Sequence, residues 1–132
     1  MRLDSAIRET VQGRIYIGCP YSDELESVRH WRFVQVTRAA EYMLTRGLPT
    51  MSPISYSHQF AHIGGCDFEA WRELDLSLLG RWATELWVLM LPGWEQSVGL
   101  AAEIEYADEA GIPVRYIDWS PDALPWAESD GE

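Results

Sequence analysis

The chain has 132 residues, a formal net charge of -11, seven Trp and a hydrophobic content of 47%. This length and composition predict one globular domain with its own core, since a disordered chain would be poor in aromatic residues. The acidic balance counts against a nucleic-acid polymer or an anionic membrane as partner, because both require a basic surface. All ten basic residues are Arg, which excludes a Schiff-base lysine and the phosphate-binding lysine of a P-loop.

The first third of the chain predicts a helix, a strand and a longer helix. A short amphipathic helix packed outside the core is expected within residues 1–13, and a strand over 14–18. Residues 19–22 follow as a turn, and Ser22 is expected to cap a helix that reaches about residue 46. The apolar positions that define the two helices are Leu3, Ile7 and Val11 in the first, and Phe33, Val36, Ala40, Met43 and Leu44 in the second.

The middle of the chain holds a short strand candidate, a polar segment and a third helix. The strand is expected over 50–54, and the segment 55–66 is interpreted as a loop or a single helical turn, of the kind that often covers a site. The helix is expected from Asp67 to about residue 83. Its inner positions are Trp71, Leu74, Leu78 and Leu79.

The stretch from residue 85 to 115 organises the rest of the fold. The apolar run 86–91 predicts a strand buried on both faces, and Pro92 with Gly93 ends it. Ser97 offers a hydroxyl N-cap for a helix, and 114–117 forms a second strand, so that the unit is strand, helix, parallel strand. The apolar stripe of this helix is Leu100, Ile104, Ala107 and Gly111.

The full order predicts an α/β fold: a flavodoxin-like, doubly wound parallel sheet of four to five strands with helices on both faces. We expect a single domain over 1–132, with a core of about 14–117. The acidic tail 118–132 is expected to be partly disordered or laid across a partner.

In such folds the ligand lies beyond the carboxyl ends of the strands, where the strand order reverses. For a flavodoxin-like order this crevice lies between the first and third strands, which brings the loop at 18–22 against the loop at 92–97. Tyr16, Ser97 and Glu103 are then expected to share one site. Because Glu103 lies near the amino end of its helix, the positive end of the helix dipole is expected to keep it ionised.

These residues resemble the nucleoside 2-deoxyribosyltransferase superfamily, which includes the deoxynucleoside 5'-monophosphate N-hydrolases. The resemblance rests on Tyr16 before Gly18, on Asp75 in Asp-Leu-Ser-Leu-Leu, and on Ser97-Val-Gly-Leu-Ala-Ala-Glu103 followed by Gly-Ile-Pro-Val. It covers about 14–117. It is closest to an uncharacterised branch of small bacterial and phage proteins that share the Leu-Pro-Gly-Trp-Glu-x-Ser-x-Gly and Ser-Pro-Ile-x-Tyr-Ser-His patterns.

The resemblance implies cleavage of the N-glycosidic bond of a nucleoside or nucleotide, or transfer of its deoxyribosyl group, without a cofactor. It makes Glu103 the nucleophile at the anomeric carbon, Asp75 the group that assists proton transfer to the departing base, and Tyr16 the residue that orients the glutamate. Two carboxyl groups suit this chemistry, because one captures an oxocarbenium-like centre while the other protonates the leaving group. The residues expected to bind substrate are Ser97, Gly18, Gly99, Trp94, Tyr56 and His58.

Each of these residues also has a structural interpretation. Asp75 can be a charge on a helix surface, Tyr16 a core residue and Ser97 only a cap. Glu103 can be a structural carboxylate hydrogen-bonded at a helix start, and His58 and Tyr56 can simply pack within their loop. Trp94 can stack on a base or pack in a dimer contact.

One loop departs from the hydrolase pattern. Asp23 and Glu24 lie where the hydrolases have an Arg near the phosphate, and they would repel an anion, which disfavours a 5'-monophosphate. Arg29 and Arg32 offer compensating charge, although a solvated or salt-bridged role is favoured for both.

Metal binding and disulfide bonding are not expected. His58, His62 and Cys66 have metal-like spacing, but no further ligand completes a zinc site. Cys19 and Cys66 are expected as free thiols in a reducing cytoplasm.

The expected partner is a small-molecule nucleoside or nucleotide, in a homodimer. The alternative functions are a non-catalytic nucleotide or nucleotide-sugar binding module, and a purely structural protein.

Overall fold

The computed structural model describes residues 1–10, 12–61 and 63–120. Four parallel strands form one sheet in the order β2-β1-β3-β4, where the strands are β1 (Ile15–Gly18), β2 (Thr50–Met51), β3 (Glu85–Leu89) and β4 (Val114–Ile117). Strand order therefore reverses between β1 and β3. The predicted α/β, flavodoxin-like doubly wound sheet is confirmed, with the smaller of the two expected strand numbers.

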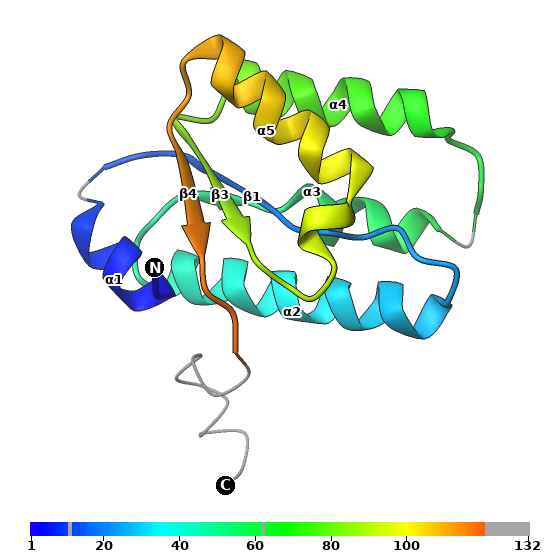
Figure 1. The fold of residues 1–132 in the computed structure, drawn as a ribbon, viewed down its shortest axis with the longest axis horizontal. Helices are drawn as coiled ribbons and strands as arrows, with labels where there is room; N and C mark the ends of the chain where they lie inside the picture. The colour runs from blue at the N-terminus through cyan, green and yellow to red at the C-terminus, as the bar shows by residue number, and fades with distance from the viewer. Residues whose placement is uncertain (11, 62, 121–132) are drawn as a thin grey trace, which may run out of the picture.

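The side chains of the inner strands point alternately to the two faces of the sheet, and each face is covered by its own apolar layer. Ile15 and Ile17 of β1 face one layer, whereas Tyr16 between them faces the other. The first layer includes α1 (Leu3–Glu9) and α2 (Glu26–Thr45), and the second includes α4 (Phe68–Arg81) and α5 (Val98–Ala110). Helices thus cover both faces of the sheet (Figure 1).

Helix α1 forms within the predicted range but does not lie outside the core. Leu3 and Ala6 are buried in the layer beneath α2, and Ile7 packs against that layer. Val11 lies outside the described residues. The expectation failed because the burial of a short helix depends on its distant neighbours, which a local repeat does not specify.

Helix α2 begins later than predicted. Ser22 does not cap it: the helix starts at Glu26 after Leu25, which makes no side-chain cap. The chain instead turns at Asp23, whose carboxylate accepts a hydrogen bond from the Leu25 amide at 2.9 Å. The predicted burial of Leu44 is also wrong, since its side chain is 53% exposed. Val36, Ala40 and Met43 of the same predicted stripe are buried.

The expected strand at 50–54 is cut short by a helical turn. Ser52 accepts a hydrogen bond from the Ser55 amide and starts α3 (Pro53–Ser57), which continues into η1 (His58–Phe60). Helix α4 then begins at the predicted cap, where the Asp67 carboxylate accepts from the Ala70 amide at 2.9 Å. Of the predicted inner positions of α4 only Leu79 is fully buried, and Leu74 is 38% exposed.

The unit from β3 to β4 follows the prediction closely. After β3 and the turn η2 (Trp94–Gln96), the Ser97 hydroxyl accepts from the Leu100 amide at 3.2 Å and caps α5. Gly111 ends α5 with a φ of 74°, a left-handed conformation that glycine adopts without strain. Among the described residues, no helix is long and apolar enough to cross a bilayer.

The predicted acidic tail is described only as far as residue 120. Asp118 pairs with Arg2 in an isolated parallel bridge, and Trp119 packs against the first apolar layer. The rest of the tail lies outside the described residues.

Candidate active site at the carboxyl end of the sheet

A cavity of about 570 Å³ lies at the carboxyl end of β1. Its walls come from the end of β1 and the loop after it, from the α3–η1 segment, from α4, and from the first two turns of α5. This is the switch-point crevice between β1 and β3, where a ligand site was expected.

Glu103 lines this cavity, and Tyr16 binds its carboxyl group from the buried side. Tyr16 is fully buried in the apolar layer that includes α5, and its hydroxyl donates a hydrogen bond to Glu103 Oε2. Gly18, at the end of the same strand, leaves room for this carboxylate: a Cβ at Gly18 would lie 3.3 Å from Glu103 Oε1 and 3.2 Å from Leu100. The glycine therefore permits the close approach of α5 to β1.

Asp75 reaches the same cavity from α4. Its Oδ1 is buried and has no hydrogen-bond partner among the described residues. Its negative charge raises the pKa of both Tyr16 and Glu103, so the three groups interact. A buried acceptor without a partner is costly, which marks Asp75 as a group that a ligand can satisfy.

Burial is the largest cause of the pKa shifts of Glu103, Asp75 and Tyr16. It raises the pKa of Glu103 from 4.5 to about 8, with a further increase from Asp75, although the hydrogen bond from Tyr16 opposes both. Burial alone raises the pKa of Asp75 from 3.8 to about 6. Burial, followed by the charges of Glu103 and Asp75, raises the pKa of Tyr16 well above its ordinary value, which keeps its hydroxyl a donor.

These pKa values correct one expectation about Glu103. Its place near the amino end of α5 suggested that the helix dipole keeps it ionised at neutral pH. Glu103 lies in the second turn, whereas α5 begins at Val98, and the dipole effect falls off within the first turn. Desolvation therefore exceeds the dipole effect, and the raised pKa favours the protonated form of Glu103 at neutral pH.

Two further residues of the predicted set line the cavity. Ser97 does so while its hydroxyl caps α5, and Gly99 lies in the first turn of the same helix. A Cβ at Gly99 would meet no atom within 4 Å, so packing alone does not require glycine there. The structure thus brings Tyr16, Gly18, Asp75, Ser97, Gly99 and Glu103 together.

Trp94, Tyr56 and His58 are not among the described residues that line the cavity. Trp94 packs with Tyr116, with ring centroids 5.6 Å apart. His58 stacks on Phe33 at 4.2 Å and accepts or donates a 2.7 Å hydrogen bond with the Tyr21 hydroxyl. Tyr21 itself lines the cavity, so His58 is one hydrogen bond removed from it.

Arg29 and Arg32, near the first loop, donate hydrogen bonds to backbone carbonyl oxygens. Arg32 is buried, and its guanidinium donates to the carbonyls of Tyr21, Ser22 and Pro92 at 3.3, 2.9 and 3.1 Å. Arg29 donates to the Asp23 carbonyl. Arg32 is therefore neither solvated nor salt-bridged among the described residues, but joins the loops that follow β1 and β3.

Several cavity residues were not anticipated. Cys19 and Tyr21 extend the first loop along the wall, and Phe60, Phe68 and Trp71 add three aromatic side chains. The sequence held one signal for the last group: Phe68 and Trp71 precede Asp75 at helical spacing. Trp71 had instead been assigned to the inner stripe of its helix.

Both cysteines are free thiols, as expected, with Cys19 buried and Cys66 exposed. Burial raises the pKa of Cys19, so its thiol stays protonated beside the carboxylates. Among the described residues there is no cluster of three or more His, Cys, Asp or Glu that could hold a metal ion. His62, part of the metal-like spacing, lies outside them.

The fold and the cavity define a Rossmann-like α/β protein with two carboxyl groups at its switch point. The chain belongs to a family described as a domain of unknown function, DUF1937, whose model matches residues 13–119. No curated protein matches the sequence.

Proposed function

We propose that this protein cleaves the N-glycosidic bond of a nucleoside or nucleotide, by hydrolysis or by transfer of the sugar to a second base. The observation that carries the proposal is the pair of carboxyl groups, Glu103 and Asp75, in one cavity, with the Tyr16 hydroxyl bonded to Glu103. The resemblance of Tyr16, Asp75 and the Ser97 to Glu103 element to the deoxyribosyltransferase superfamily supports the same roles.

In the first step a Glu103 oxygen attacks the anomeric carbon as the carbon–nitrogen bond breaks. The electron pair of that bond leaves with the base, which takes a proton from Asp75. The sugar is then held as an ester of Glu103. In the second step Asp75 removes a proton from water or from a second base, which displaces the sugar and restores both carboxyl groups.

The proposed reaction requires one proton on the pair, located on Asp75. With pKa values of about 8 for Glu103 and about 6 for Asp75, the pair carries one proton between these two pH values, mainly on Glu103, so the reactive arrangement is the less populated of the two. The hydrogen bond that Tyr16 donates lowers the pKa of Glu103 and so favours the reactive arrangement, in which Glu103 is ionised. This gives Tyr16 a positioning and electrostatic role.

The test is to incubate the protein with ribonucleosides, deoxynucleosides, their 5'-monophosphates and NAD, and to separate free base by chromatography. Release of base that depends on the protein supports the proposal. No release from any of them contradicts it.

A binding module without turnover is the second candidate. The observation that favours it is the raised pKa of Glu103, because a protonated carboxyl group is a poor nucleophile but a good hydrogen-bond donor to a sugar hydroxyl. In that case a nucleoside or nucleotide would raise the melting temperature without releasing base.

A further inference from the structure

The wall of the cavity that α4 and the preceding turn provide is aromatic. Phe60, Phe68 and Trp71 all line it. The rings of Phe60 and Trp71 have centroids 5.4 Å apart, and Tyr56 supports both of them edge-on, at 5.2 Å and 6.3 Å. These contacts fix Phe60 and Trp71 relative to each other without a ligand.

Phe68 is the exposed member of this wall. Its side chain is 58% exposed while it lines the cavity, and no other described aromatic ring packs against it. Covering an apolar ring that is exposed to water lowers the free energy of the complex, which favours ligand binding. Phe68 is therefore placed to contact a ligand.

The aromatic wall and Asp75 share one helix face. Phe68, Trp71 and Asp75 stand at positions i, i+3 and i+7 of α4, which recur on one side of a helix, and all three line the cavity. Glu103 lines the cavity from α5 instead, and Tyr16 of β1 is hydrogen-bonded to it. The cavity is thus lined by one carboxyl group from α5, and by a second from α4 that accompanies the aromatic wall.

We propose that Phe60, Phe68 and Trp71 form the subsite for the leaving group, which they hold by stacking. This inference rests on the proposed function, in which Asp75 gives its proton to the leaving group and that group consequently lies against the α4 face. The ligand class for this subsite is a planar heteroaromatic base. Because stacking depends on ring area and tolerates different ring edges, both purines and pyrimidines bind, and purines bind more tightly.

The test measures binding of free adenine, free cytosine and 2-deoxyribose to the full chain by calorimetric titration. Phe68→Ala and Trp71→Ala should each weaken adenine binding about tenfold, the scale expected for loss of one stacking ring, and leave 2-deoxyribose binding unchanged. Leu74→Ala is the matched control, because Leu74 is 38% exposed on the same helix and is not among the described residues that line the cavity. Phe68→Ala removes an exposed ring, so it tests the subsite even if Trp71→Ala fails to fold.

The outcomes separate the subsite from the proposed function. If adenine binds and the two variants weaken it, the subsite is supported even when no substrate releases base, and only the proposed function fails. If wild type releases base but both variants keep the wild-type Michaelis constant, the subsite is wrong and the proposed function stands. Failure of wild type to bind adenine at millimolar concentration, or tighter binding of cytosine than of adenine, would also overturn the subsite.

Discussion

Replacing Glu103 by Gln should stabilise the protein, and the gain should grow with pH. Gln keeps the size of the side chain and can still accept the hydrogen bond from Tyr16, but it does not ionise. The folded pKa of Glu103 is about 8, above its ordinary value of 4.5, so the folded protein keeps a proton that the unfolded chain releases between these values. Wild-type stability is therefore lost as the pH rises from about 4.5 to about 8, and the variant escapes this loss.

The magnitude follows from the same two pKa values. Their difference, at about 1.36 kcal/mol per pKa unit, gives a penalty of about 5 kcal/mol at high pH. Because the cavity admits water, we expect roughly half of this, and a gain between pH 5 and pH 9 of about 2 kcal/mol. For a domain of this size the melting temperature should then rise by about 8 °C more at pH 9 than at pH 5.

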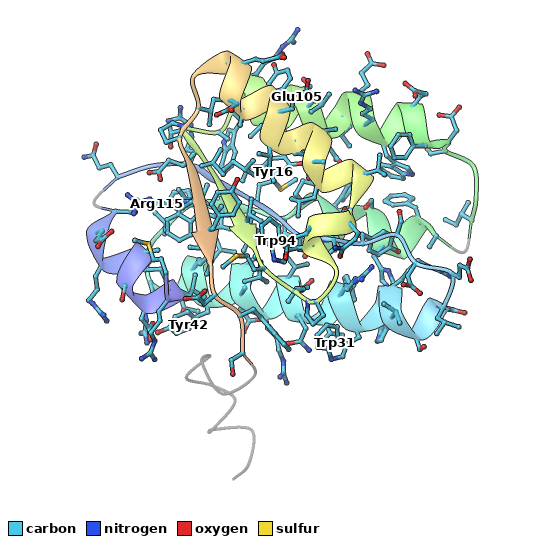
Figure 2. All side chains as sticks on the ribbon, viewed as in Figure 1. Tyr16, Trp31, Tyr42, Trp94, Glu105 and Arg115 are labelled. Atoms are coloured by element: carbon cyan, nitrogen blue, oxygen red, sulfur yellow. The ribbon has the colours of Figure 1, made fainter. Side chains whose placement is uncertain are left out.

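The assay is urea unfolding of the wild type and the variant at pH 5, 7 and 9, and it needs no substrate. Glu105→Gln is the matched control, since this exposed carboxylate on the same helix points away from the sheet (Figure 2) and its removal should give no such trend. An equal effect of Glu103→Gln at pH 5 and pH 9, or a loss of stability at pH 9, would refute the argument that burial controls the protonation of Glu103.

Three further predictions concern activity and assembly. Asp75→Asn should lower turnover by about a hundredfold or more with little change in ligand affinity, because the amide keeps the size but cannot transfer a proton; an unchanged rate would remove Asp75 from the mechanism. The rate of base release should follow a bell-shaped pH profile, falling below about pH 6 and above about pH 8, because the singly protonated pair is lost on either side; a rate that rises steadily through pH 9 would contradict this. Light scattering should give the mass of a homodimer at micromolar concentration, since the small domain is rich in aromatic residues and Val98 leaves an apolar side chain 80% exposed; a monomer mass would count against it.

The sequence predicts the sheet and the meeting of Tyr16 with Glu103 because both follow from short-range rules. The apolar run 86–91, with a predicted helix before and after it, indicates an inner parallel strand buried on both faces. Successive side chains of β1 point to opposite faces of the sheet, and Tyr16 lies on the face that α5 covers. The switch-point rule then brings the ends of β1 and α5 together. The cap at Ser97 is a local pattern of the same kind.

The features that the sequence does not predict depend on distant contacts. Ser22 has the right side chain for a cap, but the chain turns at Asp23 and the helix begins only at Glu26. Arg32, in the second turn of α2, instead binds the Ser22 carbonyl across ten residues of sequence. Leu3 is buried through packing between segments far apart in the chain.

The protonation of Glu103 shows the same limit at the site itself. Its place on α5 suggested an ionised group, whereas burial by the surrounding elements sets its pKa. Trp71 likewise fits a core stripe by its spacing alone, and only the cavity distinguishes the two roles.

The most direct test of the proposed function is a comparison of wild type with Glu103→Ala in the base-release assay, with wild type quenched in acid during turnover. The variant should fold, because removing one carboxylate costs little packing, yet it should release no base. Peptide mass mapping of the quenched wild type should find a sugar adduct within residues 96–106. Wild-type release by the variant, or an adduct outside this segment, would contradict a Glu103 nucleophile.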